Sequence, residues 1–236
     1  MRRRDLLLGP ALLALGGLGG CGPALATRIP DVRIVPGRLA AGPSSVSVFE
    51  FGGDGSLTSR PDWTGDAAQN VDAAVAARVT VNGGRTFVPE DVAHTDVPYG
   101  DFRRWASGAL QEIAGALAGT RASAHRSVSE WRYPQSLSTW RAALRADFVL
   151  AVLFADAYEA ARQGAAAAPP AAAAYRAAQT GIACVVSLGD GRIVWCATAR
   201  AAFGDLRAAE PARAAVGAIV TELCPKGELP AASPGN

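Results

Sequence analysis

Runs of apolar and alternating residues predict the strands of this chain. Polar and apolar residues alternate over 45–51, which is typical of a strand with one buried face. The stretch 148–155 is apolar without interruption, and its β-branched and aromatic content predicts a central strand buried on both faces. A short strand is expected at 86–88, after a Gly-Gly turn.

The clearest local signal is a hairpin made of 181–188 and 192–198. The two segments are joined by a Gly-Asp-Gly turn, and a type I turn with Gly191 in the left-handed conformation would pair Leu188 with Arg192. The C-terminal hairpin is followed by an amphipathic segment, so we expect a helix after it.

Apolar residues at a spacing of three and four predict helices over 62–79, 102–117, 136–145 and 211–223. Asp62 or Thr64 is expected to cap the first of these and Asp101 the second. Together these elements predict one soluble α/β domain over 45–226, with a mixed sheet of about four to five strands and helices packed on it.

The first twenty residues follow a different pattern, which is that of an export signal. Three arginines precede an apolar run of about a dozen residues that ends in small residues. A membrane-spanning helix needs about 20 apolar residues, so this run is too short to be a permanent span.

The end of this segment resembles the lipobox of bacterial lipoproteins. Leu18-Gly19-Gly20-Cys21 has an aliphatic residue, two small residues and then cysteine. The resemblance implies cleavage between Gly20 and Cys21, diacylglycerol on the Cys21 thiol and acylation of its amine. Two or three acyl chains anchor a protein stably, whereas a single chain is marginal. The alternative is a plain signal peptide with an incidental cysteine.

Two further resemblances concern the route and the destination. Arg3-Arg4 resembles the twin-arginine export signature, and an ordinary positively charged start is the equal alternative. Gly22 follows the cysteine where Asp would stand in inner-membrane lipoproteins, which resembles the pattern sorted to the outer membrane. We therefore expect a chain on the inner leaflet of the outer membrane, facing the periplasm.

Charge and composition limit the kinds of partner that the domain is expected to bind. The precursor has 23 Lys and Arg against 21 Asp and Glu, and removal of the signal leaves twenty of each. A neutral domain lacks the basic footprint of nucleic-acid binding and any polybasic aid to membrane binding. Residues 21–44, rich in Pro, Gly and Ala, are expected to be the lipid anchor and a flexible tether, and 227–236 a disordered tail.

Three cysteines remain besides Cys21, and an odd number leaves at least one thiol free or paired between molecules. The hairpin register places Cys184 directly opposite Cys196, so a disulfide between them is one interpretation. The other is that both are small buried apolar residues, as free cysteines often are.

The second half of the chain resembles envelope lipoproteins related to the curli secretion-channel lipoprotein. The resemblance lies in Ala146-Asp147-Phe148-Val149-Leu150, in the hairpin 185–195 and in Gly204-Asp205-Leu206-Arg207. It covers 130–224 well and 45–120 only in the order of elements, and it departs at the hairpin turn. It implies a fold rather than a function, and the long alternating segments of a membrane β-hairpin are missing from the sequence.

Chemistry-bearing motifs are sparse. His94 and His125 have no second ligand at helical or hairpin spacing, so surface positions are expected and no cofactor or metal is predicted. Asp147 and Asp156 lie at opposite ends of one predicted strand. The tryptophans are expected in the core, with a ligand groove as the alternative. The leading hypothesis is a non-catalytic module that binds an envelope protein or itself; the alternative is a ligand carrier or an enzyme with an unrecognised site.

Overall fold

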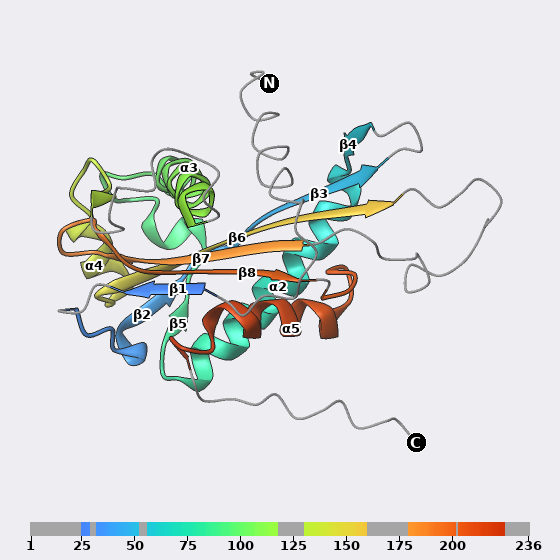
Figure 1. The fold of residues 1–236 in the computed structure, drawn as a ribbon. Coiled ribbons are helices and arrows are strands. Elements are labelled where there is room, and N and C mark those ends of the chain that lie inside the picture. Colours follow the sequence, from blue (N-terminus) through green and yellow to red (C-terminus); the bar gives the residue numbers. More distant parts are fainter. Residues whose placement is uncertain are drawn as a thin grey trace.

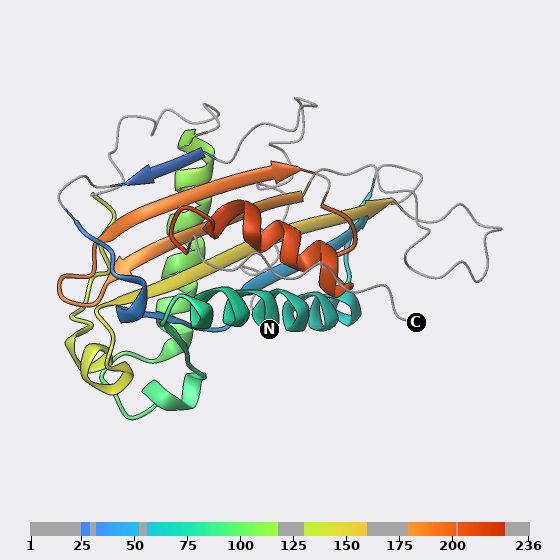
Figure 2. The same ribbon diagram turned by 90° about the horizontal axis from the view of Figure 1, so that it is seen from below.

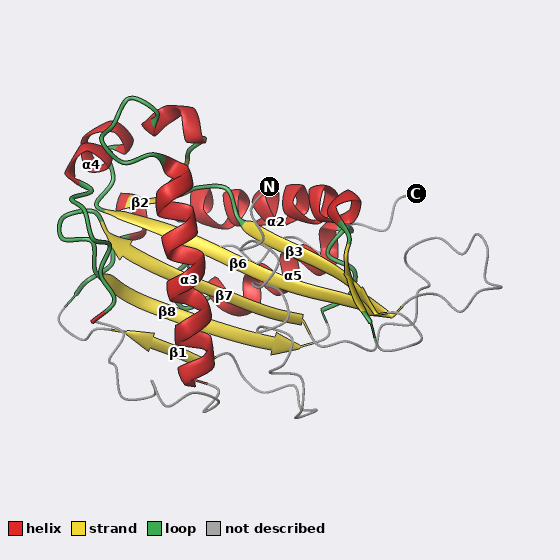
Figure 3. Cartoon of the chain, turned by 90° about the horizontal axis from the view of Figure 1, so that it is seen from above, coloured by secondary structure: helices red, strands yellow, loops and turns green. Residues whose placement is uncertain are grey.

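The computed structural model describes residues 25–28, 32–51, 56–117, 130–159, 179–201 and 203–224. Its centre is a twisted mixed β-sheet with helices on both faces (Figure 1). Helices α2 (Pro61–Val81) and α5 (Ala209–Val220) cover one face, as seen from below in Figure 2. Helix α3 (Tyr99–Leu117) crosses the other face, as seen from above in Figure 3. The predicted α/β architecture is therefore confirmed.

The described strands form one sheet in the order β1-β8-β7-β6-β2-β5, with β3 beside β6 and β4 beside β3. Their bounds are β1 Leu25–Arg28, β2 Leu39–Ala41, β3 Ser45–Phe51, β4 Leu57–Ser59, β5 Arg85–Thr86, β6 Phe148–Glu159, β7 Gln179–Ser187 and β8 Ile193–Ala201. Strands β2 and β3 pair in parallel with successive halves of β6, so they share one position across the sheet. The sheet is thus wider than expected, and the additional strands are the short ones that leave little periodicity.

The remaining helices are α4 (Ser138–Leu144) and the short 3-10 helices η3 (Pro36–Arg38) and η4 (Pro89–Val92). The predicted capping residues lie inside their helices. Helix α2 begins at Pro61, because proline suits the first helical position, and Asp62 lies in the first turn. Thr64 instead bonds its own helix, its hydroxyl lying 3.0 Å from the Arg60 carbonyl oxygen. Helix α3 begins at Tyr99, with Asp101 in its first turn.

Strand β6 is buried on both faces, as predicted. Leu150, Val152 and Phe154 pack into the core beneath α2 and α5. Val149 and Leu153 pack into a second core beneath α3 and α4. The strand runs beyond the predicted end at 155 to Glu159, because β3 continues to pair with it over that length.

Part of the expected tether belongs to the sheet, so the prediction of a flexible segment over 21–44 is wrong there. Strand β2 fills the gap between β6 and β5, and its residues Leu39, Ala40 and Ala41 are at most 1% exposed. Strand β1 pairs antiparallel with β8. A buried strand of three residues shows no alternation, so the composition of the segment concealed it. The expected tail over 227–236 lies outside the described residues.

The C-terminal hairpin is confirmed, including the left-handed Gly191, whose φ is 72°. The closing pair is different, because the Ser187 amide donates to the Arg192 carbonyl at 2.8 Å and Leu188 lies within the turn. An irregularity between Val185 and Val186 then shifts the register by one residue. The different closing pair and the shift between Val185 and Val186 compensate one another, so the strands have the predicted pairing further from the turn. The sequence did not indicate either irregularity.

Candidate functional site

The predicted cysteine pair lies in the core. Cys184 is directly opposite Cys196 in the β7–β8 pairing, as expected, and both thiols are free and fully buried. Burial raises the pKa of the Cys184 thiol well above its usual range and that of Cys196 to about 12. Cys224, after α5, is also buried and free, with its pKa raised to about 11 by burial. Such thiols stay protonated at neutral pH and act as small apolar residues.

The proposed lipidation site at Cys21, the cleavage site between Gly20 and Cys21, and His125 lie outside the described residues. His94 follows η4 and is exposed. Among the described residues, no group of three or more His, Cys, Asp or Glu side chains could hold a metal ion.

The two strand-flanking aspartates do not meet. Asp147 accepts from Arg38 at 2.8 Å and pairs with Arg141 at 2.7 Å, and these hydrogen bonds lower its pKa. Asp156 is fully buried on β6, nine residues further along the strand. At about 3.3 Å a residue, that separation is roughly 30 Å.

The tryptophans divide between the two cores rather than lining one groove. Trp140 and Trp195 are buried on opposite faces of the sheet. Trp63 is half-buried at the start of α2, and the guanidinium groups of Arg60 and Arg207 lie 3.7 and 4.3 Å from its ring centroid. Two cations against one ring make Trp63 a packing residue held by cation–π contacts.

The polar cluster of greatest interest lies at the junction between β2 and β3. Ala41 pairs with Leu150 and Ser45 with Leu153, so four steps along this chain match three along β6. The additional residue forms a bulge, which breaks the strand at Gly42-Pro43-Ser44. Bulges redirect side chains and free backbone groups, and they occur often beside functional sites.

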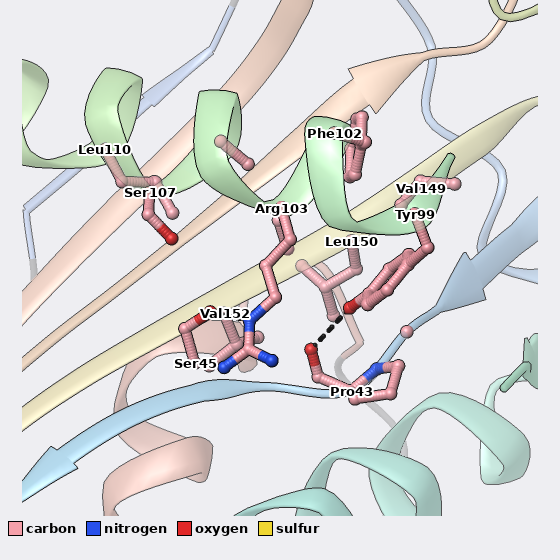
Figure 4. Close-up of a pocket in the computed structure, with 13 residues that line it drawn as sticks. Pro43, Ser45, Tyr99, Phe102, Arg103, Ser107, Leu110, Val149, Leu150 and Val152 are labelled. Carbon is pink, nitrogen blue, oxygen red and sulfur yellow. Dashed lines mark hydrogen bonds between the residues drawn. The ribbon is translucent and has the colours of Figure 1, made fainter. Parts of the chain in front are cut away.

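Side chains from both helical layers satisfy the backbone of this bulge. The Tyr99 hydroxyl of α3 donates to the Pro43 carbonyl at 2.7 Å (Figure 4). The Ser44 amide donates to the Asp72 carboxylate of α2 at 2.6 Å. One turn along α3, Arg103 Nε donates to Ser45 Oγ at 2.9 Å. The bulge is therefore held between α2 and α3.

Burial and charge set the protonation states at the junction. Burial raises the pKa of Tyr99 to about 12, so its hydroxyl is a neutral donor at physiological pH. Burial also raises the pKa of Asp72, and hydrogen bonds from Ser44 and the positive charge of Arg103 oppose that rise. Asp72 and Arg103 thus influence one another across the bulge, although they belong to different helical layers.

A hollow opens where Arg103 and Ser107 of α3 face Pro43 and Ser45 of the bulge, over β6 (Figure 4). Its empty space is about 300 Å³ when the solvent in front of it is included, and the enclosed part has room for about one water molecule. It is lined by one guanidinium group, that of Arg103, and by the hydroxyl groups of Ser45, Tyr99 and Ser107. This arrangement suits the tip of one acidic or polar side chain from a partner.

Sequence reasoning missed this site. Tyr99 and Arg103 lie one turn apart on α3, and Asp72 lies on another helix, so each resembles an ordinary helix-surface residue. The only local signal is the Gly-Pro pair at 42–43, and the composition of 21–44 predicts a tether there.

No helix among the described residues is long and apolar enough to cross a membrane. No protein-family model matches this chain, and no curated protein matches it.

Two solved structures resemble the chain weakly. The PelC dodecamer from Paraburkholderia phytofirmans in space group P6 is 12% identical with a TM-score of 0.40. A point variant of that dodecamer in space group C2 is 11% identical with a TM-score of 0.39. Each match covers 86% of this chain and 99% of the other. Likeness at this level carries no argument about function.

Proposed function

We propose that this chain is a lipid-anchored, non-catalytic module of the bacterial envelope that binds another envelope protein or a second copy of itself. The observation that carries the proposal is the order of features at the start of the chain: three arginines, a short apolar run, and Leu18-Gly19-Gly20-Cys21. The resemblance of 130–224 to curli-related envelope lipoproteins supports the same location. Gly22 favours the outer membrane, with the domain in the periplasm.

The junction at 42–45 supports binding as the activity. Its hollow presents the Arg103 guanidinium at an exposed rim, and the enclosed space is about the size of a water molecule. Small-molecule sites typically occupy about 300–1,000 Å³ of concave space. A single partner side chain fits the described geometry better than a bound metabolite does.

The lipid anchor is tested by replacing Cys21. In cells labelled with radioactive palmitate, the unaltered chain should carry label and be recovered in the outer-membrane fraction, because Cys21 carries the acyl chains. Cys21→Ala should abolish the label and block signal cleavage, whereas Cys224→Ala, which removes a buried thiol, should leave labelling unchanged. Label that persists in Cys21→Ala would contradict the proposal.

The binding activity is tested by crosslinking in intact cells and recovering the lipidated protein from membranes. We expect one specific crosslinked species. Arg103→Glu should reduce its yield, because the side chain at the rim of the hollow then carries a negative charge and no longer donates to an acceptor on the partner. Arg104→Glu is the matched control, since Arg104 lies on the same helix and pairs with Asp101 instead. A strictly monomeric protein with no crosslinked partner would count against binding.

A further inference from the structure

We infer that the membrane lies along the β1 edge of the sheet, so that β1 and β8 lie beside the phospholipid headgroups while the Arg103 hollow lies four strand positions away from that edge. This inference rests on the proposed lipidation of Cys21. It replaces a loosely tethered domain with one held close to the bilayer in a defined orientation.

The first step is the distance between the anchor and the fold. Strand β1 begins at Leu25, which pairs with Thr198 of β8, and Arg28 pairs with Trp195. Leu25 is four Cα–Cα steps from Cys21, and a fully extended chain of that length spans at most about 14 Å. A tether over 21–44 would instead have allowed a reach of roughly 80 Å. The pairing of β1 with β8 therefore fixes which part of the domain lies beside the lipid.

The second step is the width of the sheet. Strand β1 stands at one end of the strand order, and β2 and β3 lie four strand positions away. At about 4.8 Å between neighbouring strands, the junction at 42–45 is about 19 Å from β1. The β5 edge is about 24 Å away, beyond the reach of the anchor.

Helices cover both faces of the sheet, so the β1 edge is the surface nearest to the anchor. Helices α2 and α5 cover one face and α3 crosses the other (Figures 2 and 3). A domain lying flat would place a helical layer about 10 Å thick between the sheet and the bilayer, and that layer would take up most of the anchor's reach of about 14 Å. The edge position leaves that reach available to Cys21. Because the processed chain has equal numbers of acidic and basic residues, the length of the anchor rather than net charge sets this orientation.

An edge beside the headgroups has a consequence for the sheet. In the described strand order, β1 has a neighbour only on its β8 side. The unpaired N–H and C=O groups of an edge strand can pair with a strand of another chain. Holding β1 at the membrane surface keeps that edge from other copies and leaves the hollow, four strand positions away, free to meet a periplasmic partner.

The orientation is measured with spin labels on the lipidated, membrane-extracted protein. Single cysteines are introduced as Thr198→Cys on β8, Thr86→Cys on the opposite edge, and Ala214→Cys on the exposed side of α5. The native thiols are buried, so labelling is confined to the introduced sites. Vesicles contain phosphatidylethanolamine, phosphatidylglycerol and a small fraction of nickel-chelating lipid, which relaxes spins near the headgroups.

We expect several-fold greater nickel relaxation at position 198 than at positions 86 and 214. Inserting about 20 Gly and Ser residues after Gly22 adds roughly 25 Å of reach and should remove this difference without altering the domain. Equal relaxation at all three sites, or the strongest signal at position 86 or 214, would overturn the inference while palmitate on Cys21 still supports the anchor. Loss of palmitate labelling would remove both.

Discussion

A half-buried carboxylate holds the irregular junction between β2 and β3. Asp72 accepts the Ser44 amide at 2.6 Å, and burial raises its pKa above the ordinary value of 3.8. The folded protein therefore binds a proton at this site more readily than the unfolded chain does. Stability from this group is lost as the pH rises above 3.8 through the raised pKa, because the carboxylate must then ionise in a desolvated position.

Asp72→Asn should remove the dependence of stability on this carboxyl group. The amide oxygen still accepts from Ser44, but the pH-dependent loss disappears. The free energy of unfolding of the unaltered protein, minus that of Asp72→Asn, should fall as the pH rises from 3 to 7 in urea titrations. Asp66→Asn, on the exposed side of the same helix, is the control for removing one charge. A difference that rises with pH would contradict the assignment.

Individual side chains were the hardest features to predict from the sequence. The Cys184–Cys196 juxtaposition was predictable, because residues of a hairpin are placed by counting from its turn. The Tyr99–Pro43 and Asp72–Ser44 contacts were not, since they join segments 56 and 28 residues apart. Such contacts depend on how two helical layers pack around one bulge.

Among the elements, β7 depends on one close approach. Gly181 faces Phe154 of β6, and a Cβ at Gly181 would stand 2.4 Å from a ring carbon of this fully buried phenylalanine. The ring occupies the space that a side chain on β7 would otherwise fill. The pairing of the two central strands therefore requires glycine at this position.

We expect Gly181→Ala to destabilise the protein by about 1–3 kcal/mol, because the Phe154 ring must leave its packed position. Gly108→Ala on α3 should have the opposite sign, a gain of about 0.5–1 kcal/mol, since a Cβ there meets nothing within 4 Å and alanine favours helix. Chemical denaturation of both variants measures the pair. The close-approach argument fails if Gly181→Ala is as stable as the unaltered protein.

At the scale of the whole molecule, the fold begins before the predicted boundary at 45. Strand β2 lies between β6 and β5, and Leu39, Ala40 and Ala41 are at most 1% exposed. Strand β1, in contrast, adds one pairing at the edge. Strands β1 and β2 both lie in the segment predicted to be a tether, but β2 should contribute more to stability than β1.

Two truncated chains separate these contributions. A chain that starts at Val32 should retain a single cooperative thermal transition, because it keeps β2 and loses only the β1 edge. A chain that starts at Ser45 should lose that transition, since β2 contributes residues to the cores on both faces of the sheet. Circular dichroism on heating distinguishes them. Equal midpoint temperatures would show that β2 is dispensable.

The sequence by itself determined the elements whose signals are local. Neighbouring residues alone produce the alternation over 45–51, the apolar run from 148, the three-four spacing of the helices and the turn at Gly191. The same is true of the lipobox residues, which support the proposed membrane location. Only the tertiary structure decided that β1 and β2 join the sheet, and that side chains of α2 and α3 hydrogen-bond the bulge. These features depend on the space left between distant segments, which no local pattern records.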